Sequence, residues 1–155
     1  MKKIKTDSMM QPEGNKKVSQ GVSSRAKLYA EAMKSVFEAE NGGSEFVAID
    51  LDTLVELDEQ EKEWVLEELR SLPVKQVCIL EDIKDDETKF EYRDGQLMLA
   101  KNGTILSVRL ISFEENQAEI EATSWFGNVG AVFITYTAKY QNGKWFLKEK
   151  HRAVS

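Results

Sequence analysis

The chain has 155 residues, of which 41% are apolar and 31% are charged, with 27 acidic and 21 basic side chains, one histidine and one cysteine. A chain of this size and composition is expected to form one globular domain around a single core. The sequence has no run of about 18 apolar residues for a transmembrane helix. One cysteine excludes an internal disulfide framework and a zinc ribbon.

The charge is distributed unevenly along the chain. Residues 1–30 carry a net charge of +5, residues 31–100 carry -13 and residues 101–155 carry +2. An acidic centre repels nucleic acid and anionic lipid, so the charge argues against both as partners. The simplest interpretation is that acidic helix and loop faces keep the protein in solution.

Residues 1–23 are predicted to form a disordered or weakly ordered tail, and residues 24–155 a single domain. The tail places lysines among Gln, Ser, Gly and Asn, with little apolar content. Lys2 and Lys3 follow Met1 as in a signal peptide, but the apolar stretch of about 7 to 15 residues is missing. We expect a cytoplasmic protein, or an exported protein or lipoprotein if a longer precursor exists.

The first predicted helix starts near Ser23 or Ser24, either of which can cap it. It ends at the segment Asn41-Gly42-Gly43, which suits a helix terminus. The spacing of three and four residues between apolar positions predicts one buried face, formed by Tyr29, Ala32, Met33, Val36 and Phe37.

The second predicted helix runs from Asp58 to Leu72. Asp58 and Glu61 have the spacing of a capping box, and Pro73 ends the helix. Its glutamate-rich outer face indicates a helix with one side in water.

Strands dominate the rest of the sequence. Residues 46–51 form a short apolar run, typical of a strand covered on both faces. Beyond Phe90 apolar residues alternate with polar ones, and hairpin signals recur at Asp94-Gly95, Asn102-Gly103, residues 115–117 and Asn142-Gly143. We therefore predict an α+β fold, in which two N-terminal helices pack on one face of a curved antiparallel sheet with a C-terminal meander of about four to five strands.

The segment 124–132 is the candidate binding site. It contains Trp125, Phe126, Gly127, Asn128 and Gly130 between two patterned strands. One interpretation is a shallow aromatic groove with exposed backbone amides. The other is a hairpin loop or bulge, whose glycines have positive φ angles or allow close approach while the aromatic residues cap the core.

No catalytic residue, metal or cofactor is predicted. Cys78 lies in an apolar run, where a reactive thiolate is disfavoured, and His151 lies near the C-terminus, where we expect exposure. The acidic segment 81–87 lacks the ligand spacing of an EF-hand. The Ser-x-x-Lys match at residues 24–27 stands without the other motifs of penicillin-interacting enzymes.

The last predicted strand is basic. Strict alternation would place Lys144, Phe146, Lys148, Lys150 and Arg152 on one face. Such a face can bind single-stranded nucleic acid, or its lysines can protect a sheet edge from unwanted pairing.

Several of these segments together resemble a group of small Gram-positive bacterial proteins, often exported or lipoproteins, to which no activity is assigned. The shared features are Ala48-Ile49-Asp50, the helix at 58–72, the link Gly127–Gly130, the strand at 133–140 and Asn142-Gly143-Lys144-Trp145. A looser resemblance, at the level of the fold, is to cystatin-like and nuclear-transport-factor-like domains. Enzymes of that superfamily place a buried Asp and His in a pocket, and His151 does not match that pattern.

Three functions stay open. The first is a non-catalytic domain that binds a protein or peptide through the sheet or the 124–132 segment. The second is a small-ligand pocket, enzymatic or not, between helices and sheet, with a volume of roughly 300 Å³ or more. The third is an acidic inhibitor, of the immunity type, for a basic toxin or nuclease, suggested by the -13 segment.

Overall fold

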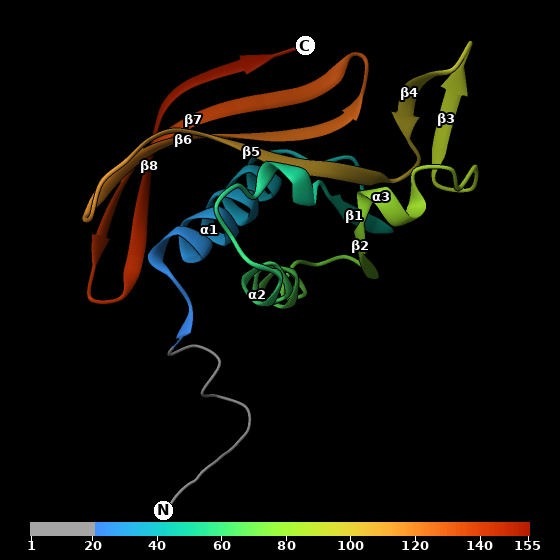
Figure 1. Cartoon of the computed structure of the whole chain (residues 1–155). Helices are drawn as coiled ribbons and strands as arrows, with labels where there is room; N and C mark the ends of the chain where they lie inside the picture. Colours follow the sequence, from blue (N-terminus) through green and yellow to red (C-terminus); the bar gives the residue numbers. More distant parts are fainter. Residues whose placement is uncertain (1–20) are drawn as a thin grey trace, which may run out of the picture.

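A computed structural model describes residues 21–155 (Figure 1). The helices are α1 (Ser24–Ala39), α2 (Glu59–Leu69) and the short α3 (Leu80–Ile83), with a 3₁₀ turn, η2 (Leu51–Thr53). The strands are β1 (Phe46–Ile49), β2 (Gln76–Ile79), β3 (Phe90–Arg93), β4 (Gln96–Ala100), β5 (Gly103–Phe113), β6 (Gln117–Gly127), β7 (Gly130–Gln141) and β8 (Lys144–Val154).

The strands form one open, mostly antiparallel sheet. Its long part runs β2-β1-β5-β6-β7-β8, and the β3–β4 hairpin joins β6 through the pair Leu99 and Gly127. The long strands arch over α1, and α2 lies below α1 (Figure 1). The β3–β4 hairpin projects at the right of the view, close to α3. The predicted α+β class, with helices packed on a curved sheet, is confirmed.

The structure adds a parallel segment that the sequence did not predict. β1 pairs in parallel with both β2 and β5. α2 provides the crossover from β1 to β2, which a parallel pair requires. Val47 and Ile49 contact the main core, whereas Phe46 and Ala48 contact a second cluster on the other face. The predicted burial of this strand on both faces is therefore confirmed.

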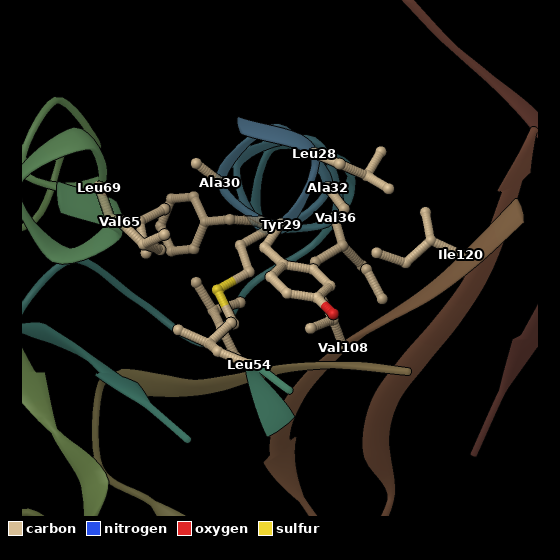
Figure 2. Packing of buried hydrophobic residues seen from close by; sticks show 14 of the residues in the cluster. Leu28, Tyr29, Ala30, Ala32, Val36, Leu54, Val65, Leu69, Val108 and Ile120 are labelled. Atoms are coloured by element: carbon tan, nitrogen blue, oxygen red, sulfur yellow. The ribbon is translucent and has the colours of Figure 1, made fainter. Parts of the chain in front are cut away.

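α1 lies at the centre of the main core. Its first turns bury Leu28 and Tyr29, and its later turns bury Met33 and Val36. Figure 2 shows Tyr29 and Val36 of α1 close to the sheet residues Val108 and Ile120, with Val65 and Leu69 of α2 on the other side of the helix. Truncating one such side chain to alanine is expected to cost about 2–5 kcal/mol of stability, so the packing around α1 contributes much of the stability of the fold.

The second cluster covers the opposite face of the sheet near β1. Phe46 and Phe90 meet edge to face with ring centroids 5.5 Å apart. The turn Asn102-Gly103 leads into this region but does not join paired strands, because β4 pairs with β3 and β6 instead of β5. A Cβ on Gly103 would lie 2.2 Å from the ring of Phe46, so close packing of the ring explains this glycine.

The start of α1 is linked to the start of α2. The Ser23 side chain accepts a hydrogen bond from Ala26 N–H, and Asp58 forms the predicted capping box with Glu61. Glu61 Oε2 also accepts a hydrogen bond from Ser23 N–H at 3.0 Å. Hydrogen bonding to Ser23 lowers the pKa of Glu61 below its ordinary value of 4.5.

Residues 1–20 of the predicted tail at residues 1–23 lie outside the described residues. The segment that was compared with a signal peptide is among them. Within residues 21–155, none of the helices has the length and apolar character needed to cross a membrane.

Replacing Glu61 tests the link between the two helix starts. Because its folded pKa is lowered, Glu61 stabilises the fold at pH values above its ordinary pKa, and this stabilisation is lost as the pH falls through the folded pKa. We expect Glu61→Ala to lower the free energy of unfolding by about 1 kcal/mol at pH 7, with a smaller difference at pH 3. Urea denaturation measures both values.

Glu63→Ala is the matched control, because Glu63 lies on the exposed face of the same helix. An equal loss of stability in both variants, or a loss that does not depend on pH, would contradict the role of Glu61.

Candidate functional site

The five residues predicted to form a binding site lie together at the turn between β6 and β7. Gly127 and Gly130 face each other across the turn as the last pair of the two strands. Trp125 is half-buried and packs against the second core cluster. Neither glycine has a positive φ angle. The expectation that these glycines supply positive φ is therefore wrong, and close approach explains Gly130 instead.

Phe126 is the residue that requires this close approach. A Cβ on Gly130 would lie 2.7 Å from the Phe126 ring, and a Cβ on Gly42 would lie 2.3 Å from Phe126 Cβ. The ring therefore lies against two glycines from separate parts of the chain, and it is half-buried.

The tip of the turn is tied to β4. Asn128 N–H donates a hydrogen bond to the Met98 carbonyl at 3.1 Å, so this amide is occupied. Val129, at the tip, is 89% exposed. This arrangement fits the hairpin interpretation, and a binding role for Trp125, Phe126, Gly127, Asn128 and Gly130 stays a prediction.

A groove lies elsewhere, between α1, α2 and the start of β8. This groove has a volume of about 580 Å³. Its walls are one side of α1, one side of α2 and the β7–β8 hairpin. The residues lining it are Lys27, Ala30, Glu31, Lys34, Ser35, Trp64, Glu68, Gly143, Lys144, Trp145, Phe146 and Leu147.

Trp145 anchors the hairpin to the start of α1. Its Nε1–H donates a hydrogen bond to the Ser24 carbonyl at 2.7 Å, and the side chain is buried. Its ring packs against Tyr140 and Phe113, with centroids 4.9 Å and 6.0 Å apart. The β8 side of the groove is therefore held in place by an aromatic cluster.

β8 forms the edge of the sheet beside this groove. It spans 11 residues and, among the residues that the structure describes, pairs with β7 alone. The lysines of this strand indicate a sheet edge from the sequence alone. The groove beside the edge depends on how α1 and α2 pack. The sequence predicted the strand and left open a pocket between helices and sheet, but it did not place that pocket beside β8.

A β-bulge changes which β8 residues share a face. Glu149 pairs with Tyr136 while His151 pairs with Thr135, so Lys150 is an extra residue on β8. Arg152 consequently lies opposite buried Ile134 and on the same face as Glu149, with which it forms two hydrogen bonds at 2.8 and 2.9 Å. The prediction that Arg152 shares a face with Lys144 and Lys148 is wrong, because strict alternation cannot account for an inserted residue.

Before the bulge the predicted alternation holds. Lys144, Phe146 and Lys148 pair with Gln141, Lys139 and Thr137 on the convex face of the sheet. Trp145 and Leu147 belong to the opposite, concave face and contact the core. Phe146 is 56% exposed.

The turn that joins β7 to β8 determines the direction of the backbone groups. Asn142 and Gly143 have positive φ angles and form a two-residue hairpin turn, so Gln141 and Lys144 form the first hydrogen-bonded pair. Hydrogen-bonded and non-hydrogen-bonded pairs alternate from there. The N–H and C=O groups of Trp145 and Leu147 therefore point outward, away from β7.

The basic residues of β8 differ in their pairing. Lys150 Nζ lies 3.0 Å from Glu119 and Arg152 is paired with Glu149. Lys144 and Lys148 have no salt bridge to any residue in 21–155. Within the described part of the chain these two cations are therefore unpaired, and each lies two positions along β8 from the exposed Phe146.

Cys78 and His151, the two groups considered for catalysis, lie on different strands, β2 and β8. Cys78 is half-buried in β2, and burial raises its pKa above the ordinary 9.0, which favours the unreactive thiol. His151 is exposed, as predicted. Burial raises the pKa of Asp50 above 3.8. In residues 21–155 no group of three or more His, Cys, Asp or Glu side chains is placed to hold a metal.

Substitution of Gly130 tests the packing at the β6–β7 turn. We expect Gly130→Ala to destabilise the fold by about 1–3 kcal/mol, because the new Cβ overlaps the Phe126 ring. The added cost should largely disappear in a Phe126→Ala background, since the atoms it meets are gone. Thermal or urea unfolding of the four proteins of this double-mutant cycle measures the coupling.

Gly21→Ala is the control, because a Cβ at Gly21 meets no atom within 4 Å. Additive effects of Gly130→Ala and Phe126→Ala would show that the ring and the glycine are not in contact.

Comparisons of the chain with protein-family models, with curated proteins and with solved structures find no match. The resemblances to small Gram-positive proteins and to cystatin-like or nuclear-transport-factor-like domains therefore stay predictions.

Proposed function

We propose that the protein is a non-catalytic interaction domain that binds an extended segment of a partner protein as an added strand along β8. The observation that carries this proposal is the open edge of β8, which borders the groove of about 580 Å³ between α1 and α2. Strand addition uses backbone hydrogen bonds for affinity and side-chain contacts for specificity.

The start of β8 has the features that strand addition needs. The outward N–H and C=O groups of Trp145 and Leu147 are the groups that a new strand pairs with. The side chain of Trp145 anchors this part of β8 to α1 through its hydrogen bond to the Ser24 carbonyl. A preformed edge reduces the entropy lost on binding.

The small-ligand alternative is less well supported by the same groove. Its volume exceeds the predicted minimum, but two of its lysines are already engaged. Lys27 lies 3.4 Å from the Tyr140 hydroxyl and Lys34 lies 3.1 Å from Glu68. Polar groups that converge on an empty space are typical of a ligand pocket, whereas these two lysines contact Tyr140 and Glu68. The acidic-inhibitor alternative stays a prediction.

Peptide selection tests the proposal. A display library of random peptides is selected against the full chain, and the affinity of the selected peptides is measured by fluorescence anisotropy. The same measurement is made on semisynthetic protein with an N-methyl group on the Leu147 amide, which removes an outward donor and keeps the side chain. We expect at least about a tenfold loss of affinity, with an unchanged circular dichroism spectrum.

N-methylation of the peptide provides the matched control. Methyl groups on alternate residues that face β8 should abolish binding, whereas the same number on the intervening residues should not, because only one edge of the peptide pairs with the sheet. Binding that tolerates N-methyl Leu147, or a library that yields no binder, would refute strand addition at β8.

A further inference from the structure

The two faces of β8 present different chemistry to an added strand. On the convex face Lys144 and Lys148 flank the exposed ring of Phe146. On the concave face Trp145 and Leu147 lead to the wall of the groove formed by Trp64. Side chains of an added strand alternate between the two faces, as in any strand.

We infer that the segment that pairs with β8 is acidic, with acidic and apolar residues in alternation. This inference rests on the proposed function. Acidic side chains of the added strand lie beside Lys144 and Lys148, where opposite charges on neighbouring strands are favourable. The apolar side chains lie on the concave side, over Trp145 and Leu147 and toward Trp64, where they remove apolar surface from water.

The neighbouring charges strengthen this preference. Lys139 pairs across the ladder with Phe146, so it adds a third cation to the same part of the convex face. On the convex face Glu119 is paired with Lys150 and Glu121 with Arg109. Glu114 and Glu115, at the neighbouring β5–β6 turn, line a hollow together with Lys139. Lys144, Lys148 and Lys139 therefore gather positive charge at the start of β8 on a protein whose net charge is -6.

Two of the ways in which two β8 strands can pair about a twofold axis oppose like charges. An axis at Phe146 puts Lys144 opposite Lys148 of the second copy, and an axis at Lys148 puts that lysine opposite itself. Like charges directly opposite each other are destabilising. Axes at Trp145 or Leu147 instead put a lysine opposite Phe146, which brings no attraction between charges, whereas an acidic strand places opposite charges beside both lysines.

Three synthetic peptides test the inference by fluorescence anisotropy on the full chain. The first alternates acidic and apolar residues, Glu-Val-Glu-Leu-Glu-Val-Glu. The second replaces each Glu with Lys, and the third has the composition of the first with its acids grouped at one end. We expect the first to bind at least about tenfold more tightly than either of the others, with an affinity that falls as salt is added.

Charge reversal on the protein identifies the residues responsible. The double variant Lys144→Glu/Lys148→Glu should weaken binding of the Glu peptide by about tenfold or more and favour the Lys peptide. The control Arg93→Glu/Lys101→Glu changes the net charge equally, at β3 and just beyond β4, and should leave both affinities unchanged. Circular dichroism checks that each variant is folded.

The outcomes separate this inference from the proposed function. Equal affinity for the Glu and Lys peptides, together with library peptides that remain sensitive to N-methyl Leu147, would overturn the acidic preference and leave strand addition intact. Tighter binding of a single-stranded oligonucleotide than of the Glu peptide would also overturn it, in favour of a nucleic-acid surface. Peptide binding that does not depend on the Leu147 amide would overturn both.

Discussion

The burial of α1 beneath the arched sheet is the constraint on which the rest of the structure depends. Eight of the side chains of α1 are buried, including Leu28, Tyr29, Met33 and Phe37. The sheet covers part of this surface and α2 covers another part, as Figure 2 shows. Because apolar residues occupy more than one side of the helix, neither layer alone could shield it from water. The remaining side of α1, with Lys27, lines the groove.

The position of the candidate site follows from this arrangement. The sheet curves around α1 and ends at β8, so the edge of the sheet comes to lie beside the exposed side of the helix. Trp145 fixes that edge through its contact with Ser24. The groove and the open strand are thus consequences of how one helix is covered, and a partner that pairs with β8 also meets side chains from α1 and α2.

Local signals in the sequence predicted the elements that depend on neighbouring residues. The cap at Ser23, the capping box of Asp58 and Glu61, and the hairpin turn at Asn142 are all present. The inward faces of the long strands follow the predicted alternation as well. The hairpin predicted at residues 102–103 is wrong, because β4 pairs with β3 and with the distant β6 instead of β5. Turn propensity does not report which strands will pair.

By itself, the sequence determined the order of the two longer helices and of the long strands, the buried faces of most elements and the basic character of β8, but not the short helix α3. The tertiary structure decided the parallel pairing of β1, the bulge that moves Arg152 to the concave face, and the groove beside β8. The physical reason is the separation in sequence between the residues that interact. Capping, turn formation and alternation involve residues close in the chain, whereas pairing register and groove shape depend on contacts between Ser24 and Trp145, or Gly42 and Phe126, that only the folded chain brings together.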